Sequence, residues 1–319
     1  MKVLIADKYE DQGLDGLKAL GCEVIYTPDL TAEQLPTAIA DTDPTVLIVR
    51  STKVQDPAIE AAQSLKVIIR AGAGYDTIQT ATARAKGISV CNCPGTNSAA
   101  VAELTFGLML AHDRRIPDQT ADLRQGVWDK KKYSKMGRGL KGRTLGLIGV
   151  GQIGILVARR AVAFDMQVLY HKRTPCEELD NNPNAQRVSL EQLLAESDFV
   201  SLHVPSNDST KHLINAQTLA QMKNDAVLIN TTRGAVVDQA ALAEALTAGT
   251  IGGAALDVYE NEPAAGDTAI ANEVVAIPAF LGTHHVGAST EQAQLAVAAM
   301  TVDIVTAFKN DGTVLNCVN

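Results

Sequence analysis

A glycine-rich stretch near the middle of the chain restricts the possible folds more than any other feature. The apolar run Leu145–Ile148 predicts a buried strand, which leads directly into GVGQIG at residues 149–154, a G-x-G-x-x-G pattern. The apolar pattern of Ile155–Phe164 predicts a helix, and Met166–Tyr170 predicts a second strand. The glycine pattern alone is weak, but with a strand, a helix and a second strand around it, it is typical of a dinucleotide-binding βαβ unit.

The three glycines of this pattern have separate physical roles. Gly149 permits the tight turn, Gly151 has no side chain to keep a pyrophosphate from the backbone, and Gly154 lets the helix pack on the strand. Gln152 and Ile153 lie between the second and third glycines, at the N-terminus of the expected helix. Free N–H groups and a partial positive charge there favour phosphate, so residues 149 and 151–154 are expected to bind a dinucleotide.

Composition and charge limit the classes of function. The 319 residues are 46% hydrophobic, which suits one large or two medium domains with proper cores. A net charge of -8 argues against nucleic acid as the main partner. No apolar run is long enough to span a bilayer, and the N-terminus reads as a strand rather than a signal peptide. The five cysteines are scattered, so we expect a reduced, cytoplasmic protein with no metal site.

Strands and helices alternate through the first hundred residues. Helices are expected at residues 15–20, 31–40 and 57–62, between strands at Val3–Ala6, Glu23–Tyr26, Thr45–Val49, Lys66–Ile69 and Ile88–Cys91. This alternation predicts a parallel sheet covered on both faces. No glycine pattern follows the first strand, so this region is expected to bind something other than the dinucleotide.

Two of these strand ends carry an arginine. Arg50 follows one strand, and Arg70 follows the next strand and precedes Ala71-Gly72-Ala73-Gly74. Ligands of open parallel sheets bind beyond the carboxyl ends of the strands, where two arginines suit a phosphate or a carboxylate. Taken by themselves, solvated loop charges are the simpler interpretation.

Polar residues also follow the later strands, which are predicted at residues 199–204, 226–230 and 253–256, with helices at 213–222 and 238–248 between them. The relevant segments are NTTRG at 230–234, DVYENEP at 257–263 and THHVG at 283–287. Because the carboxyl ends of parallel strands share one edge, a cation, a carboxylate and a histidine are expected to meet where the dinucleotide binds.

Three further segments carry predictions. Residues 99–114 form a helix that is apolar nearly all round, and such a helix is buried. Residues Trp128–Tyr133 are a basic loop, which is either a solvated face or a segment that reaches an anionic substrate across a dimer. Ser289 and Gln292 form a capping box for a final helix that runs to about Phe308.

The residues after the second strand of the glycine unit bear on the choice of cofactor. An Asp or Glu at this point accepts hydrogen bonds from the ribose of NAD, but this chain has Lys172 followed by Arg173. A carboxylate would repel a 2′-phosphate, whereas two cations attract one. We therefore expect NADP; the alternative is NAD, with both cations pointing into solvent.

The strand-end groups suit the reduction of a 2-oxo acid. His285 can supply the proton for the carbonyl oxygen, because the pKa of imidazole lies nearest neutrality. Glu262, if hydrogen-bonded to it, would hold the ring and favour the imidazolium. Arg233 can grip the substrate carboxylate through two hydrogen bonds. Spacing alone does not separate His285 from His284, and Glu262 shares its acidic loop with Glu260.

Together these segments resemble the D-isomer-specific 2-hydroxyacid dehydrogenases. The resemblance rests on GVGQIG, NTTRGAVVD, ALDVYENEP and THHVGASTEQAQ, in this order along the chain. It implies that the catalytic residues are Arg233 in N-x-x-R-G, Glu262 before the proline, and His285 before the V-G-A-S-T segment. The family usually has proline at the position of His284.

The resemblance also implies an α/β fold with two Rossmann-like, doubly wound parallel-sheet domains. Residues 1–98 and 286–319 would form a flavodoxin-like substrate-binding domain, and residues 99–285 an inserted dinucleotide-binding domain, with a cleft between them that closes on substrate. A homodimer is implied as well. Beyond the glycine turn, the implied cofactor-binding residues are Lys172, Arg173, Pro205, Thr231, Thr232, Asp257 and Gly287, and the implied substrate-binding residues are Arg50, Arg70, Ala73 and Gly74.

Within the family, the chain most resembles D-3-phosphoglycerate dehydrogenases, through Arg50-Ser51, residues 70–74, the basic loop and the G-A-S-T form of the histidine motif. This implies that Arg50 and Arg70 bind a substrate phosphate, that lysines around Lys131 join from a partner subunit, and that the reaction serves serine biosynthesis. The chain ends at Asn319, so C-terminal regulatory domains are not expected. The alternatives are an NADPH-dependent glyoxylate/hydroxypyruvate reductase and, in another class, a cofactor-sensing corepressor.

Overall fold

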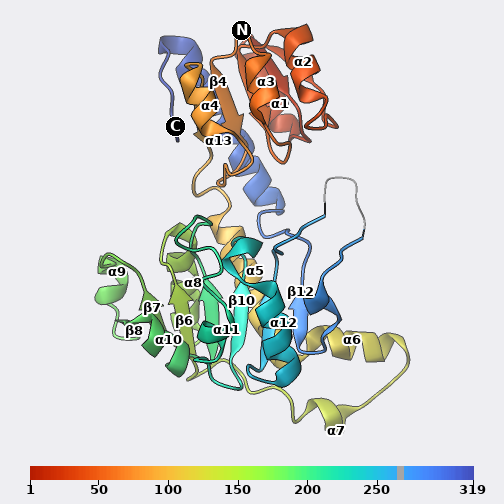
Figure 1. Ribbon diagram of the computed structural model, residues 1–319, viewed down its shortest axis with the longest axis vertical. Coiled ribbons are helices and arrows are strands. Elements are labelled where there is room, and N and C mark those ends of the chain that lie inside the picture. The colour runs from red at the N-terminus through yellow and green to blue at the C-terminus, as the bar shows by residue number, and fades with distance from the viewer. Residues whose placement is uncertain (264–268) are drawn as a thin grey trace. The chain divides into compact units, whose positions relative to one another are not determined.

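The computed structural model describes residues 1–263 and 269–319, and its strands form two parallel sheets (Figure 1). The chain divides into unit 1, which contains Met1–Asn97 and Ala288–Asn319, and unit 2, which contains Ser98–Gly287. Each unit holds one sheet with helices on both of its faces. Two parallel-sheet α/β units, one inserted in the other, confirm the predicted fold class.

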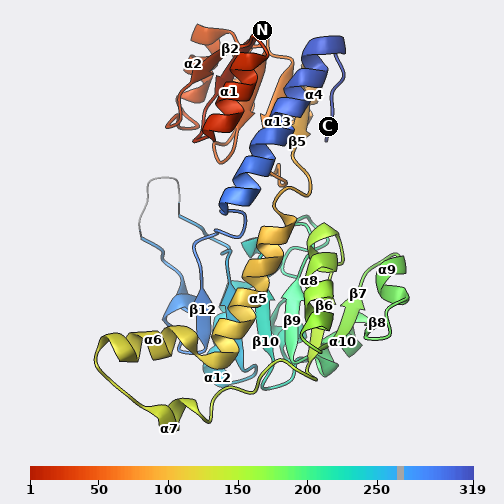
Figure 2. The same cartoon turned by 180° about the vertical axis from the view of Figure 1, so that it is seen from behind.

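Unit 1 has five strands in the order β2-β1-β3-β4-β5, the flavodoxin-like order. Helices α2, α3 and α4 cover one face, and α1 and α13 pack side by side on the other (Figure 2). The elements are β1 (Lys2–Ile5), α1 (Asp11–Ala19), β2 (Glu23–Tyr26), α2 (Leu35–Thr42), β3 (Val46–Val49), α3 (Asp56–Glu60), β4 (Val67–Arg70), α4 (Thr80–Ala85), β5 (Ser89–Asn92) and α13 (Glu291–Asp311).

Unit 2 has seven strands in the order β12-β11-β10-β9-β6-β7-β8. Helices α10, α11 and α12 cover one face, and α5 and α8 cover the other (Figures 1 and 2). The strands are β6 (Thr144–Ile148), β7 (Gln167–His171), β8 (Ala185–Arg187), β9 (Phe199–Leu202), β10 (Val227–Asn230), β11 (Gly253–Leu256) and β12 (Phe280–Gly282). The helices are α5 (Ser98–Arg114), α6 (Ile116–Arg124), α7 (Lys130–Tyr133), α8 (Gln152–Ala163), α9 (Glu177–Asp180), α10 (Leu190–Glu196), α11 (Ala216–Leu219) and α12 (Gln239–Ala248), with 3-10 turns at Gly234–Val236 and Glu273–Ala276.

The strand order of unit 2 explains where a ligand can bind. From β6 the chain adds β7 and β8 on one side and then β9 to β12 on the other, so the order reverses between β6 and β9. Crevices for nucleotides form at such a switch point, beyond the carboxyl ends of the strands. The glycine-rich turn follows β6 directly, so it lies at the switch point.

Some local predictions were wrong in detail. The final helix begins after Thr290, whose hydroxyl accepts the first-turn hydrogen bond, so the cap is one residue beyond Ser289. The basic segment is not all loop, because residues 130–133 form α7. The helix expected at 213–222 is only the single turn α11, because the side chain of Asn215 caps it and fixes its start. Hydrophobic periodicity does not locate such caps.

A buried ion cluster ties α5 to the start of the unit 2 sheet. The Arg143 side chain is only 11% exposed, donates to Asp113 at 3.0 Å, lies 3.9 Å from Asp198, and covers the ring of Phe199. Asp113 also accepts the Gly139 amide at 2.9 Å. Burial lowers the pKa of Arg143, and Asp198 and Asp113 oppose that shift. A buried charge of this kind needs its partners.

We expect Asp113→Ala to destabilise unit 2 by about 3 kcal/mol, because it removes the hydrogen-bonded partner of the buried Arg143 and leaves only the more distant Asp198 to balance its charge. Urea unfolding measures the change. The matched control is Glu178→Ala, which removes the partner of Arg159 in an exposed ion pair and should leave the unfolding free energy nearly unchanged, because solvent screens such pairs. Equal losses in the two variants would contradict a structural role for the buried cluster.

Candidate active site

The candidate site lies at the carboxyl edge of the unit 2 sheet. Because every strand is parallel, the loops after β6, β7, β9, β10, β11 and β12 all begin at this edge. All the residues predicted to be catalytic or to bind the cofactor lie in these loops or at the start of α8. The structure therefore brings the predicted residues to one edge of the sheet, and it shows how each loop is held.

The glycine turn has the shape that a dinucleotide requires. Gly149 has a φ of 89°, and a Cβ there would lie 2.6 Å from the carbonyl oxygen of His203. A Cβ on Gly154 would lie 2.7 Å from the carbonyl oxygen of Gly149, so only glycine lets α8 approach this closely. Gly151 instead faces open space, with no atom within 4 Å of an added Cβ. An open backbone surface before the N-terminus of α8 fits a pyrophosphate group.

The loop after β7 carries the two cations expected from the sequence, and a third cation contacts it from the neighbouring strand. Lys172 is half-buried and Arg173 is exposed. The guanidinium of Arg187, on β8, donates to the carbonyl oxygens of Lys172 at 3.2 Å and Arg173 at 2.8 Å. Arg187 therefore fixes the backbone of the predicted cofactor-selecting loop. Sequence reasoning missed it because β8 is short and was not predicted.

The loop after β10 is held by the last residue of that strand. Asn230 donates to the carbonyl oxygen of Arg233 at 2.9 Å and accepts the Thr232 amide at 3.0 Å, which closes the turn that presents Arg233. A Cβ on Gly234 would collide with the backbone of Tyr259. Gly234, which follows Arg233, must therefore be glycine. Its lack of a side chain lets the loop that carries Arg233, here called the arginine loop, pack against the loop after β11.

The predicted catalytic histidine and glutamate form a direct hydrogen bond. The Glu262 Oε2 atom lies 2.7 Å from Nδ1 of His285, and the other carboxylate oxygen accepts the Tyr259 amide at 3.1 Å. Burial by itself raises the pKa of Glu262, but the hydrogen bond and charge of His285, the Tyr259 amide and the charge of Arg233 outweigh it and hold the pKa below its ordinary value. Glu262 is therefore an ionised partner for the imidazole ring.

The histidine loop is held by Asp257. This carboxylate is 1% exposed and accepts hydrogen bonds from the Thr283 hydroxyl at 2.6 Å, the Val286 amide at 2.8 Å and the Gly287 amide at 2.8 Å. His285, in the middle of this loop, has a left-handed φ of 53°, and its amide donates to the carbonyl oxygen of Asp257 at 2.8 Å. Both carboxylate oxygens of Asp257 thus serve to position His285, a role that the sequence did not predict.

Tyr259 adds a second support for the same loop. Its hydroxyl donates to the carbonyl oxygen of Thr283 at 2.9 Å from a buried position. Burial, together with the charges of Asp257 and Glu262, raises the pKa of Tyr259 to about 12, so the hydroxyl keeps its proton at neutral pH. It remains a donor throughout the physiological range.

The structure separates the rival groups. Glu260 is hydrogen-bonded to Nε2 of His212 at 2.6 Å, so this acid belongs to a second histidine–glutamate pair. His284 is exposed, next to His285 in the chain. His203 lies under the glycine turn, hydrogen-bonded to Ser201, and burial lowers its pKa to about 4. Of these histidines, His285 is the one that contacts Glu262.

Some predicted cofactor-binding side chains are engaged within the protein. The Thr231 hydroxyl lies 3.2 Å from the hydroxyl of Thr105 on α5, and the Thr232 hydroxyl donates to Asn230 at 2.7 Å. The carbonyl oxygen of Pro205 accepts the Thr210 hydroxyl at 2.6 Å. These residues line the correct edge, but their side chains shape the loops.

The predicted substrate residues belong to unit 1, at the carboxyl ends of two adjacent strands. The Arg50 amide donates to Asp7 at 2.7 Å, and its guanidinium donates to Gln294 at 3.2 Å. The guanidinium of Arg70 lies over Gly72, where any Cβ would collide with it. The following segment is fixed from β5, because Asn92 donates to the carbonyl oxygen of Ala73 at 2.6 Å. The two arginines thus have defined positions at one sheet edge.

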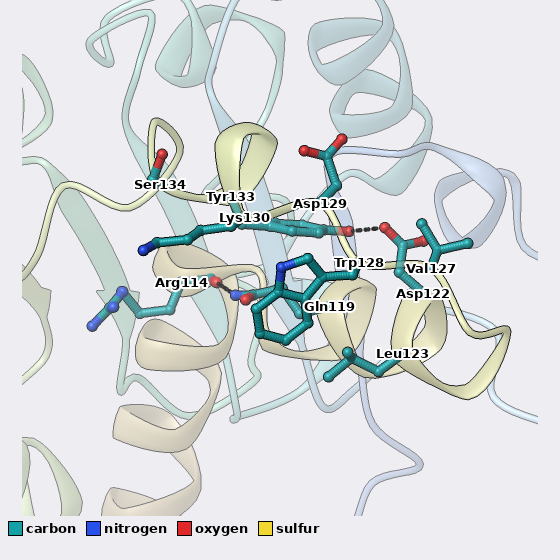
Figure 3. Close-up of a pocket in the computed structure, with 10 residues that line it drawn as sticks. All are labelled: Arg114, Gln119, Asp122, Leu123, Val127, Trp128, Asp129, Lys130, Tyr133 and Ser134. Carbon is teal, nitrogen blue, oxygen red and sulfur yellow. Dashed lines mark hydrogen bonds between the residues drawn. The ribbon is translucent and has the colours of Figure 1, made fainter.

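The basic segment lies in the connection from α5 to β6, and α5 ends beside the start of β6, at the opposite edge of the unit 2 sheet. Ten residues between Arg114 and Ser134 line a pocket of about 460 Å³ (Figure 3). In it, Asp122 accepts the Tyr133 hydroxyl at 2.6 Å and the Lys132 ammonium at 3.1 Å, while Trp128 is 79% exposed. The charge of Lys132 is therefore already paired. The role expected for lysines near Lys131 stays a prediction.

Two kinds of feature are absent from the part of the chain that the structure describes. Residues 1–263 and 269–319 contain no cluster of three or more histidine, cysteine, aspartate or glutamate side chains that could hold a metal ion. None of the helices in these ranges is both long and apolar enough to cross a membrane.

Comparison with known proteins agrees with this geometry. A family model described as "D-isomer specific 2-hydroxyacid dehydrogenase, NAD binding domain" matches residues 106–287. The D-3-phosphoglycerate dehydrogenase of Methanocaldococcus jannaschii is 42% identical over 305 residues, which cover 95% of this chain but only 56% of that protein. The hydroxypyruvate reductase of Thermotoga maritima is 43% identical over 290 residues, 90% of this chain and 91% of that protein.

A solved structure extends the comparison to the fold. The NADPH-dependent glyoxylate/hydroxypyruvate reductase of Sinorhizobium meliloti, in complex with NADP and malonate, has a TM-score of 0.86 and 31% sequence identity. The match covers 99% of this chain and 96% of that one. Similarity over nearly the whole chain supports the two-unit fold described above.

The lowered pKa of Glu262 predicts a pH-dependent contribution to stability. Because this pKa is lower in the folded chain than in the unfolded one, the carboxylate stabilises the folded state above its ordinary pKa, and this contribution is lost as pH falls through the lowered value. We expect the unfolding free energies of wild type and Glu262→Gln to differ at neutral pH and to converge below about pH 4. Urea unfolding across this range measures the difference; a gap that stays constant into acid would contradict the assignment.

Proposed function

The chain belongs to the D-isomer specific 2-hydroxyacid dehydrogenase family, and on this basis we propose that it is an oxidoreductase that interconverts a small 2-oxo acid and its D-2-hydroxy acid with NAD(P). The observation that carries the proposal is the 2.7 Å hydrogen bond between His285 and Glu262 at the sheet edge that also holds the glycine turn. Arg233 lies in the adjacent loop, and its charge acts on Glu262.

Each of the three residues has a separate role in the proposed reaction. Arg233 binds the substrate carboxylate and polarises the neighbouring carbonyl through charge-assisted hydrogen bonds. His285 donates a proton to the carbonyl oxygen during reduction and accepts it from the hydroxyl during oxidation. Glu262 keeps the ring oriented through Nδ1, which leaves Nε2 for the substrate. The bound nicotinamide cofactor supplies or accepts the hydride.

We expect His285→Gln to lower kcat by roughly 10²–10⁴-fold, because it removes the general acid. Arg233→Gln should raise KM and lower kcat, because the carboxylate loses its charged partner and the carbonyl its polarising group. The matched control is His284→Gln, the exposed neighbour, which should leave both constants near wild type. Steady-state rates with a 2-oxo acid and NADPH measure all three. Undiminished turnover in His285→Gln would refute the assigned role.

For the substrate, we propose 3-phosphohydroxypyruvate and 3-phosphoglycerate, in serine biosynthesis. Arg50 and Arg70 end two adjacent strands of unit 1, and each is held in place by neighbouring residues. Two guanidinium groups at one sheet edge suit a phosphate. The similarity to the Methanocaldococcus jannaschii enzyme supports this choice, and Ala73 and Gly74 would complete the substrate segment.

A second candidate is an NADPH-dependent glyoxylate or hydroxypyruvate reductase. The relatives from Thermotoga maritima and Sinorhizobium meliloti carry such names, and both align with most of this chain. For either candidate we propose NADP as the preferred cofactor, bound by Lys172 and Arg173 in the loop that Arg187 holds. A location in the cytoplasm and a homodimer are proposed from the family resemblance.

Initial rates on 3-phosphohydroxypyruvate, hydroxypyruvate and glyoxylate, each with NADPH and NADH, test these proposals. We expect the phosphorylated acid to be preferred and Arg50→Gln to raise its KM without changing the KM for hydroxypyruvate. We expect NADPH to be preferred, and Lys172→Asp to reverse that preference because a carboxylate repels the 2′-phosphate. Arg187→Gln should raise the KM for NADPH more than that for NADH.

The other outcomes of the same experiment are equally clear. Preference for the unphosphorylated acids, with Arg50→Gln unchanged, would favour the second candidate. Preference for NADH would show that Lys172 and Arg173 do not bind a 2′-phosphate. Tight cofactor binding without turnover on any of the acids would favour a corepressor-like protein.

A further inference from the structure

Two cysteines face each other at the edge of the unit 1 sheet. Strand β5 is the last strand of that sheet, and residues 316–319 run antiparallel beside it, with Cys91 directly opposite Cys317. The flanking backbone hydrogen bonds fix this register: the Asn92 amide donates to Asn316 at 3.2 Å, and the Val318 amide donates to Val90 at 2.8 Å. Both thiols are free.

This register places the two side chains close together. The hydrogen bonds flank the cysteines rather than joining them, so Cys91 and Cys317 form a non-hydrogen-bonded antiparallel pair. Side chains of such a pair lie on the same face of the sheet, with their Cα atoms about 4.5 Å apart. A disulfide requires a Cα separation of roughly 4.4–6.8 Å, so the backbone already has a suitable geometry.

The segment that carries Cys317 is held firmly against β5. The side-chain nitrogen of Asn319 donates to the carbonyl oxygens of Ile88 at 2.9 Å and Thr80 at 3.3 Å, and its side-chain oxygen accepts the Val90 amide at 2.8 Å. The side chain of Val318 packs against the unit 1 core. Cys317 is therefore presented at a fixed position, not on a free end.

We propose that Cys91 and Cys317 form a redox-sensitive disulfide through exchange with a low-molecular-weight disulfide such as glutathione disulfide. In the first step the Cys317 thiolate attacks one sulfur of glutathione disulfide, which forms a mixed disulfide and releases one glutathione thiolate. In the second step the Cys91 sulfur attacks Sγ of Cys317, loses its proton and releases the second glutathione thiolate. Two protein thiols are oxidised, and one glutathione disulfide is reduced to two glutathione molecules.

The environments of the two thiols set the order of these steps. Cys317 is exposed and can meet the small disulfide. Cys91 is fully buried, and burial, together with the neighbouring Cys317 and Cys93 thiols, raises the pKa of Cys91 to about 12. Cys91 therefore reacts only within the protein, with the cysteine that the strand register places opposite it. Cys93, two residues along the chain, is the nearest competing thiol.

The proposed link has a structural consequence. It closes a long loop that contains unit 2 and α13, and long closed loops restrict the unfolded chain most. It also lies one residue from Asn92, which holds Ala73 in the predicted substrate segment. Oxidation would thus fasten the edge of the sheet that supports this segment.

The full chain, incubated with glutathione disulfide and then alkylated, tests the proposal by intact-mass measurement and non-reducing peptide mapping. We expect wild type to lose two hydrogens, keep no glutathione and yield a peptide pair joined through Cys91 and Cys317. Cys91→Ser should trap one glutathione on Cys317, and Cys317→Ser should gain neither modification. The matched control Cys176→Ser, in unit 2, should form the link as wild type does. Oxidised wild type should also show a higher thermal midpoint than its reduced form, unlike Cys317→Ser.

Several outcomes would overturn the proposal. One is a wild-type chain that retains glutathione on Cys317 while Cys91 stays reduced. The others are a disulfide between Cys93 and Cys317, and the absence of any reaction at Cys317. Circular dichroism shows whether the Cys91→Ser variant, which changes a buried residue, is folded. The Cys317→Ser variant changes an exposed residue and is an independent negative control. None of these measurements uses catalytic activity, so the result is independent of the proposed function.

Discussion

In a parallel sheet every strand ends at the same edge, and in unit 2 this alignment decides which loops can meet. The reversal of strand order between β6 and β9 places the glycine turn at the switch point of the sheet, and the loops after β10, β11 and β12 begin at the same edge. Contact between loops then depends on small residues. Gly234 lets the arginine loop pack against the backbone of Tyr259, and Gly154 lets α8 approach the turn.

The proposed catalytic pair, His285 and Glu262, is held in place by neighbouring residues. Asp257 accepts hydrogen bonds from three groups of the histidine loop. The hydroxyl of Tyr259, which keeps its proton, donates to the carbonyl oxygen of Thr283 in the same loop. His285 has a left-handed backbone conformation, which the surrounding hydrogen bonds must maintain. Ionised Glu262 then meets a ring whose orientation is already set. Preorganisation of this kind is how a proton donor is kept in place for reaction.

In unit 1, backbone hydrogen bonds protect the edge of the sheet. Its edge strand β5 is covered by residues 316–319, which satisfy backbone groups that would otherwise be open to pairing. The pairing of these residues with β5 also places Cys317 opposite Cys91. The two cysteines are more than two hundred residues apart in the sequence. On the inner side of β5, Asn92 positions the segment of Ala73. One strand therefore connects a thiol pair to the predicted substrate segment.

The sequence by itself determined the alternation of strands and helices, the glycine turn, and the edge at which Arg233, Glu262 and His285 lie, because hydrophobic periodicity and local motifs depend on neighbouring residues. The sequence pattern placed the cap of the final helix at Ser289, one residue before the observed cap at Thr290. It also did not predict the short strand β8, which carries Arg187. Only the tertiary structure decided that Glu262 rather than Glu260 pairs with His285, that Asp257 holds the histidine loop, and that Cys91 faces Cys317. These pairings join segments distant along the chain, and no local pattern encodes which distant partner packing will bring within hydrogen-bonding distance.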